Sequence, residues 1–199
     1  RAKLGRPRLP LKDAVFAACF KIFSTVSGRR FISDLRAAHE KGYIEKLPHF
    51  NSIFNYLENP ELTPILRDMI TQTSLPLKSV ERDFAADSSG FTTSRFTRWY
   101  DHKYNGVRAQ HDWVKVHIMC GVTTNIVTAV EIHDKLAQDA PQLPALVNAT
   151  AKNFKIAEVS GDKAYASFKN YDAIDSVGAT PFIVFKSHHR ANTGLWAKM

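Results

Sequence analysis

The chain contains 199 residues, of which 44% are hydrophobic and 23% are charged, a composition typical of a globular protein with a substantial core. No apolar run reaches membrane-spanning length and the first residues lack the apolar segment of a signal peptide, so we expect a cytoplasmic protein. Cys19 and Cys120 are too few for a disulfide framework, and without CxxC or HExxH motifs nothing in the sequence indicates zinc.

The formal net charge of +8 is concentrated at the start of the chain. Residues 1–30 hold eight Lys or Arg residues against one Asp, which gives +7 and favours a polyanionic partner. The motif Gly5-Arg6-Pro7-Arg8 resembles an arm that lies in the minor groove of A·T-rich DNA, and a basic tail is the alternative interpretation. The candidate DNA-binding residues of this segment are Arg6, Arg8, Arg29 and Arg30.

Helical periodicity predicts an all-helical module over residues 1–78, which we interpret as DNA-binding. The expected helices cover residues 11–26, 33–41 and 51–58, followed by a fourth helix from Thr63-Pro64 and a linker at 75–78. Ser33 and Asn51 are the expected N-caps. The second and third helices are interpreted either as a helix-turn-helix, with Asn51, Ser52 and Asn55 toward bases, or as a generic helical bundle.

From residue 79 the pattern changes to strands and helices of an α/β fold. The expected order is three strands at 80–87, 113–120 and 126–132, a helix at 139–154, a strand at 156–160, a helix that Ser167 caps and that runs to Val177, and a strand at 180–185. A right-handed crossover would place the fourth strand beside the first and parallel to it, in a mixed five-stranded sheet with flanking helices.

Two short segments of this half each carry an Asp where an apolar or small-residue run gives way to a turn. Asp87 follows Phe84-Ala85-Ala86, and Asp162 follows Val159-Ser160-Gly161. A carboxylate at a strand end can offer oxygen to Mg²⁺, and two of them can bridge metal ions about 3.5–4 Å apart. The alternative is that each Asp caps a helix or a turn. The predicted strand order would bring the two residues together.

Three motifs resemble the catalytic domain of DDE transposases encoded by bacterial insertion sequences. They are Asp87-Ser88-Ser89-Gly90-Phe91, Trp113-Val114-Lys115-Val116-His117 and Gly161-Asp162-Lys163-Ala164-Tyr165. The similarity covers about residues 80–199 and implies a ribonuclease-H-like core in residues 79–199. It also implies cleavage and strand transfer of double-stranded DNA at transposon ends, with Asp87 and Asp162 as metal-binding catalytic acids, Mg²⁺ or Mn²⁺ as cofactor, and a homodimer as a candidate assembly.

The third acid of this family is a Glu on a helix after the fifth strand, in the pattern Tyr-x-x-Arg-x-x-x-Glu-x-x-x-x-x-x-Lys. This sequence has no Glu after Glu158 and ends at Met199. We therefore expect a core that is incomplete at its C-terminus, with weak metal binding and little activity on its own.

Further candidate DNA-binding residues lie around the three motifs. Residues 91–110 interleave aromatic residues with Arg95, Arg98 and Lys103, either to grip nucleic acid or as an aromatic-packed hairpin. The resemblance places Lys115 and His117 near the DNA path, whereas a solvated strand face is the alternative, and Lys163 could contact a phosphate. Tyr165 could contact a phosphate as well, but we favour its interpretation as a packing residue.

Two other functions remain open from the sequence. One is an Asp-dependent phosphatase of the haloacid-dehalogenase kind, although Ser89 occupies the position where that family has a second Asp. The other is a DNA-binding regulator or inactive transposase fragment without catalysis.

Overall fold

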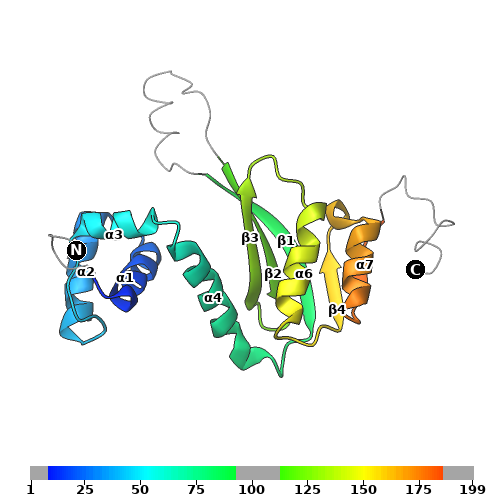
Figure 1. Ribbon diagram of the computed structural model, residues 1–199, viewed down its shortest axis with the longest axis horizontal. Helices are drawn as coiled ribbons and strands as arrows, with labels where there is room; N and C mark the ends of the chain where they lie inside the picture. The colour runs from blue at the N-terminus through cyan, green and yellow to red at the C-terminus, as the bar shows by residue number, and fades with distance from the viewer. Residues whose placement is uncertain (1–8, 93–112, 186–199) are drawn as a thin grey trace, which may run out of the picture. The chain divides into compact units, whose positions relative to one another are not determined.

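A computed structural model describes residues 9–92 and 113–185 (Figure 1). The chain forms two compact units, Arg1–Leu66 and Arg67–Met199. The division falls within helix α4 (Leu62–Ser74), ahead of the boundary at residue 78 that the sequence indicates. Among the described residues, none of the helices has the length and apolar character needed to cross a membrane.

The first unit is helical. It contains α1 (Leu11–Ser24), α2 (Gly28–Glu40), α3 (Phe50–Leu57) and the beginning of α4. Their main core cluster consists of Ala17, Phe31, Leu35, Ile44 and Ile53. Residues 41–49 separate α2 from α3, which is longer than the tight turn of a typical helix-turn-helix. The bundle interpretation therefore describes the connection between these helices better.

Two predicted helix starts in this unit were wrong. Helix α2 begins at Gly28 rather than after Ser33, because the earlier start places both Phe31 and Leu35 in the buried core. Helix α3 begins at Phe50, and its N-cap is His49, whose Nδ1 accepts a hydrogen bond from the Asn51 amide at 3.3 Å. Tertiary packing decided the first boundary, and an unexpected capping residue decided the second.

Asp13 connects α1 to the segment between α2 and α3. Its side chain is completely buried, and Oδ2 accepts hydrogen bonds from the backbone amides of Glu45 at 3.1 Å and Lys46 at 3.0 Å. One side chain of α1 thus satisfies two backbone amides of the segment, which stabilises the position of the segment on α1.

The second unit is built on a mixed five-stranded sheet. Its strands are β1 (Asp83–Thr92), β2 (Trp113–Gly121), β3 (Val127–Asp134), β4 (Glu158–Gly161) and β5 (Thr180–Ile183). Their order in the sheet is β3-β2-β1-β4-β5. Strand β2 is antiparallel to both β1 and β3, and β4 is parallel to both β1 and β5. The ribonuclease-H-like arrangement predicted from the sequence is confirmed, with the fourth strand beside the first.

Helices α6 (Leu143–Ala151) and α7 (Phe168–Ser176) pack on one face of this sheet (Figure 1). Helix α6 starts later than predicted because residues 140–142 form a separate 3-10 turn, η2 (Ala140–Gln142). Helix α7 follows the prediction: the Ser167 hydroxyl accepts a hydrogen bond from the Asn170 amide at 3.3 Å, and Gly178 follows the helix with φ of 75°.

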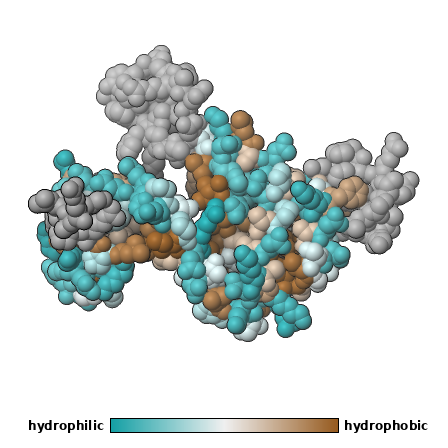
Figure 2. Space-filling model, viewed as in Figure 1, coloured by the Kyte–Doolittle hydropathy of each residue, from teal (hydrophilic) through white to brown (hydrophobic). Residues whose placement is uncertain are grey.

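The core of the second unit lies between the sheet and these two helices. Its strand residues include Phe84, Met119 and Val159, and its helix residues include Leu146 and Ile174, all with no exposed surface. Every second residue of β2 lies on the opposite face of the sheet and is only half-buried: Val114, Val116, Ile118 and Cys120. On the visible surface of this unit, polar and apolar residues are interspersed rather than gathered into one large apolar patch (Figure 2).

Glu81 is a completely buried carboxylate just before β1. It accepts hydrogen bonds from the Thr124 amide at 2.8 Å, the Thr124 hydroxyl at 2.7 Å and the Thr123 amide at 3.3 Å. Burial by itself raises the pKa of Glu81, but the bonds from Thr124 and Thr123 outweigh it, so the pKa lies below its ordinary value. The carboxylate ties the turn between β2 and β3 to the start of β1, which begins at Asp83 rather than at residue 80.

We expect Glu81→Gln to lower the free energy of unfolding of this unit by about 2 kcal/mol at pH 7, because an ionised acceptor of three hydrogen bonds becomes neutral. A lowered folded-state pKa means that the stabilisation is complete above the unfolded pKa of about 4.3 and is lost as the pH falls through the folded value. Lowering the pH from 7 to 3 should therefore destabilise the unaltered protein more than the Glu81→Gln variant, which thermal unfolding at each pH would measure. Glu158→Gln, at an exposed position of β4, is the control and should keep the full acid dependence.

Candidate functional site: paired carboxylates on β1 and β4

The parallel pairing of β1 with β4 brings Asp87 and Asp162 to neighbouring positions. The paired residues include Ala85 with Ser160 and then Ala86 with Gly161, and the next residue on each side is one of the two acids. Both side chains are exposed. One detail of the prediction was wrong: β1 does not end at Asp87 but continues to Thr92, because residues 87–92 pair with β2.

Each acid has one carboxylate oxygen held by a backbone amide. Asp87 Oδ1 accepts a hydrogen bond from the Ser88 amide at 2.7 Å, and Asp162 Oδ1 accepts one from the Ala164 amide at 2.9 Å. The second bond caps η3 (Lys163–Tyr165), so Asp162 does have the turn-capping role that the sequence offered as an alternative. The cap orients the carboxylate while leaving its side chain exposed, and it is therefore compatible with ligand binding.

Tyr165 is the last residue of η3, the turn that Asp162 caps. It is 1% exposed, and its hydroxyl lies 3.4 Å from His117 Nδ1. Burial raises the pKa of Tyr165 far above its ordinary value, and the negative charges of Asp139, Asp87 and Asp162 raise it further. The hydroxyl is therefore protonated at neutral pH. Asp87 and Asp162 thus both act on this one phenol.

Asp139 is a third carboxylate near this place, contributed by the segment before α6. Its Oδ1 lies 2.7 Å from Lys115 Nζ and 3.4 Å from His117 Nδ1. Burial would raise the pKa of Asp139, but Lys115 and a hydrogen bond from Ser88 outweigh it, so the pKa lies below its usual value. Asp139 is therefore ionised at neutral pH and paired with the Lys115 ammonium.

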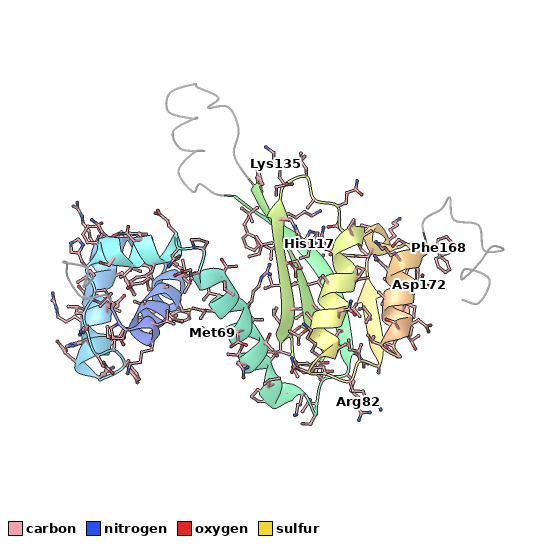
Figure 3. All side chains as sticks on the ribbon, in the orientation of Figure 1. Met69, Arg82, His117, Lys135, Phe168 and Asp172 are labelled. Atoms are coloured by element: carbon pink, nitrogen blue, oxygen red, sulfur yellow. The ribbon has the colours of Figure 1, made fainter. Side chains whose placement is uncertain are left out.

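Lys115 and His117, which the resemblance places near the DNA path, lie largely inside the protein, and the solvated strand face offered as the alternative is not observed for them. His117 is completely buried on the helix-covered face, and Figure 3 shows it on the sheet beside α6. Burial lowers its pKa, with Asp139 acting in the opposite direction. Lys115 is 24% exposed in its side chain, and its ammonium also donates to the Ala137 carbonyl at 3.2 Å. Both side chains lie on the same face of β2 as Met119, the face against which α6 packs.

The other predicted DNA-binding residues fall into two groups. Lys163 is exposed directly after Asp162, and Arg29 and Arg30 are exposed on α2, where the Arg29 guanidinium lies 5.8 Å from the centre of the Phe50 ring. The remaining candidates lie outside the described residues: Arg6, Arg8, Arg95, Arg98 and Lys103. The segment after the fifth strand, where the resemblance expects a third acid, lies outside them as well.

The donor set at Asp87 and Asp162 fits a weakly held hard cation. Two exposed carboxylates supply the oxygen ligands that Mg²⁺ and Mn²⁺ prefer, and Mg²⁺ is typically held by one or two carboxylates together with water and substrate. Within residues 9–92 and 113–185, no three His, Cys, Asp or Glu side chains are arranged to enclose a metal ion. The described chain therefore offers an open two-carboxylate site.

These features define a ribonuclease-H-like α/β domain with one carboxylate on the central strand β1 and a second directly after the neighbouring strand β4. The chain belongs to the family described as Transposase DDE domain, which it matches over residues 78–198. This is a family of enzymes that transfer polynucleotide strands, and its members generally depend on divalent metal ions.

Comparison with solved structures finds similar chains in DNA-transfer complexes. The Drosophila P element transposase strand transfer complex aligns with a TM-score of 0.46 and 12% identity, covering 94% of this chain and 43% of that one. The piggyBac transposase synaptic complex with hairpin DNA aligns with a TM-score of 0.45 and 9% identity, covering 97% and 46%. The chain thus spans less than half the length of either. No curated protein matches the sequence.

Sequence reasoning missed Asp139 and Ser88 as parts of this site. Asp139 stands before Ala140 and Pro141, a position that predicts only the beginning of a helix. In the structure it occupies the N-cap position of η2, but its side chain makes no capping hydrogen bond. No sequence signal distinguishes an Asp that caps a helix from one that turns inward to Lys115.

Proposed function

We propose that this protein acts in DNA transposition, cleaving and joining DNA at transposon ends with divalent metal ions held by Asp87 and Asp162. One observation supports this above the others: within a chain of the transposase DDE family, the β1–β4 register places two exposed carboxylates side by side. When bound, such ions would activate the attacking oxygen and stabilise the leaving oxygen of the phosphodiester.

The protein's own residues would orient the reactants. The Ser88 and Ala164 amides hold one oxygen of each acid, which directs the remaining carboxylate oxygens outward to metal and substrate. The exposed Lys163, next to Asp162, is placed to contact a phosphate of the bound strand. Lys115 has no such role in this proposal, because its ammonium is paired with Asp139.

In this proposal, duplex DNA is bound mainly by the helical module that precedes the sheet, residues 1–78. The exposed Arg29 and Arg30 supply positive charge on α2. A surface cleft beside α3 is lined by Ser52, Asn55, Tyr56, Asn59 and Glu61. The amide side chains of this set can donate to and accept from base edges. A homodimer would allow each of two transposon ends to be bound by one chain.

A regulator that binds transposon ends without cutting them is the second candidate. The described residues favour it in that they offer only two carboxylates, which bind metal weakly. The phosphatase alternative loses its support with the match to the transposase family and with the antiparallel β1–β2–β3 arrangement.

The test is excision of a marker flanked by the DNA that borders the protein's own gene. Asp162→Asn should reduce excision at least about 100-fold, because a lost metal ligand removes several kcal/mol of transition-state stabilisation, while duplex binding persists. Asp172→Asn, at an exposed position of α7, should leave excision unchanged. Tight binding of the end DNA without any excision by the unaltered protein would favour the regulator. Excision that survives Asp162→Asn would refute the assigned site.

A further inference from the structure

We propose that Asp139 is a positioning residue for the paired carboxylates: it gathers Lys115, His117, Ser88 and Tyr165 into one cluster that sets the relative positions of Asp87 and Asp162. This inference rests on the proposed function of the two acids, which would need a defined separation to share metal ions.

The orientation of Asp139 is the first observation. An Asp at an N-cap position normally accepts a hydrogen bond from the first turn of the helix. Asp139 makes no such bond at η2, and its carboxylate instead faces Lys115 at 2.7 Å and His117 at 3.4 Å. Its side chain is 20% exposed and that of Lys115 is 24% exposed. The pair is therefore mostly withdrawn from water.

The second observation is that the cluster is connected to both acids. His117 Nδ1 lies 3.4 Å from both Asp139 Oδ1 and the Tyr165 hydroxyl. Ser88 is paired with His117 in the β1–β2 register, and the Ser88 amide holds Asp87 Oδ1. Tyr165 belongs to the turn that Asp162 caps, and its amide donates to the Asp162 carbonyl at 3.1 Å. The cluster thus joins the middle of β1 to the end of β4 through side chains. Backbone pairing between these strands stops one residue earlier, at Ala86 and Gly161.

A further contact restrains Tyr165 from the side of α7. The Asn170 side-chain amide donates to the Tyr165 carbonyl at 2.6 Å, and Asn170 itself is 1% exposed. Asn170 of α7 therefore holds the backbone carbonyl of Tyr165, and His117 of the Asp139 cluster contacts its side-chain hydroxyl. Displacement of Asp139 would release only the hydroxyl end.

The cost of the cluster argues against a purely stabilising role. A Lys–Asp pair withdrawn from water commonly adds little net stability compared with apolar residues of similar volume. His117 is completely buried, and its Nε2 has no hydrogen-bond partner within the described part of the chain. A buried polar group without a partner costs free energy. Because the cluster adds little net stability, we attribute it to the positioning of Asp87 and Asp162.

The test compares Asp139→Asn with the unaltered protein in two measurements. Amide hydrogen exchange, followed by NMR without metal, should be about tenfold faster at Ser88 and Ala164, whose amides hold the two acids, while core amides such as that of Ile174 keep their protection. Calorimetric titration with Mn²⁺ should give a dissociation constant about tenfold higher, the lower end of the usual effect for residues that orient metal ligands.

Two further variants make the outcome unambiguous. Asp172→Asn removes an equal charge from the solvent-facing side of α7, away from His117 (Figure 3), and should change neither measurement. Asp139→Asn combined with Lys115→Gln avoids an unpaired Lys115 ammonium, and should reproduce the changes of Asp139→Asn if that single variant folds poorly.

The outcomes separate this inference from the proposed function. Unchanged exchange at Ser88 and Ala164 would overturn the positioning role, and so would faster exchange spread equally over the core. Faster exchange confined to those amides, in a protein that binds no Mn²⁺ even unaltered, would support the positioning role and count against the metal site. A raised dissociation constant together with the local exchange change would support both.

Discussion

Replacing either Asp87 or Asp162 with Asn should abolish the stabilisation of this protein by Mn²⁺ while leaving the metal-free protein at least as stable as before. Both carboxylates are exposed and lie side by side, so removal of one charge eases repulsion between them. An Asn oxygen can still accept the bonds from the Ser88 and Ala164 amides. The substitution therefore removes charge without removing the local hydrogen bond.

The expected effect follows from the small number of ligands. With two carboxylates, loss of one halves the negative charge that attracts the cation, and the single remaining carboxylate should no longer bind Mn²⁺ measurably. Because a ligand stabilises the folded state by RT ln(1 + [L]/Kd), the melting temperature should rise with Mn²⁺ only in the unaltered protein. Thermal unfolding across a Mn²⁺ series measures this, and Asp172→Asn should respond as the unaltered protein does.

Tight Mn²⁺ binding that persists in both variants would show that the cation is held elsewhere. A metal-free protein that loses several kcal/mol of stability on either substitution would show instead that the two acids are structural. Neither result is compatible with an open two-carboxylate site.

Removing residues 1–8 should weaken duplex DNA binding and reduce its salt dependence. The segment carries Arg1, Lys3, Arg6 and Arg8 and precedes the start of α1 at Leu11, so its loss removes four positive charges and leaves α1 at full length. Each phosphate contact contributes about 0.9 to the slope of log K against log salt concentration. The slope should therefore fall by up to about 3.6 if all four side chains reach phosphates.

The measurement is a titration of labelled duplex at several salt concentrations. Exchanging the exposed Lys152 and Lys155 for Gln removes charge from the segment after α6 and should leave the slope unchanged. An unchanged slope after removal of residues 1–8 would assign the phosphate contacts to other basic residues. Arg29→Ala with Arg30→Ala, on the exposed side of α2, would then be the next variants to test.

Much of the second unit could be predicted from local pattern alone. Alternation in residues 113–120, the turn at 123–125 and the apolar run at 126–132 indicated the β2–β3 hairpin, and Ser167 with Gly178 marked both ends of α7. The neighbouring positions of Asp87 and Asp162 also followed from the sequence. Each acid ends a recognisable run, and the handedness of the crossover leaves few ways to place β4.

Only the tertiary structure decided which side of β2 is covered. The alternation separates Val114 and Val116 from Lys115 and His117, and the sequence interpretation allowed the second set to be a solvated face. In the structure His117 faces the helices and is buried, whereas Val116 lies on the other side and is only half-buried. The answer depends on where α6 and α7 pack. Long-range pairing with β2 likewise extended β1 beyond Asp87, and packing of Phe31 moved the start of α2 to Gly28.

The sequence by itself therefore determined the order of the elements and the pair of acids, because these depend on local runs and on chain handedness. The tertiary structure decided the surroundings of the acids. Asp139 and Lys115 are separated by 24 residues along the chain, and Glu81 and Thr124 by 43. Each pair forms only because the sheet brings the two segments together, and partners of a buried charge are selected by that proximity rather than by spacing in the sequence.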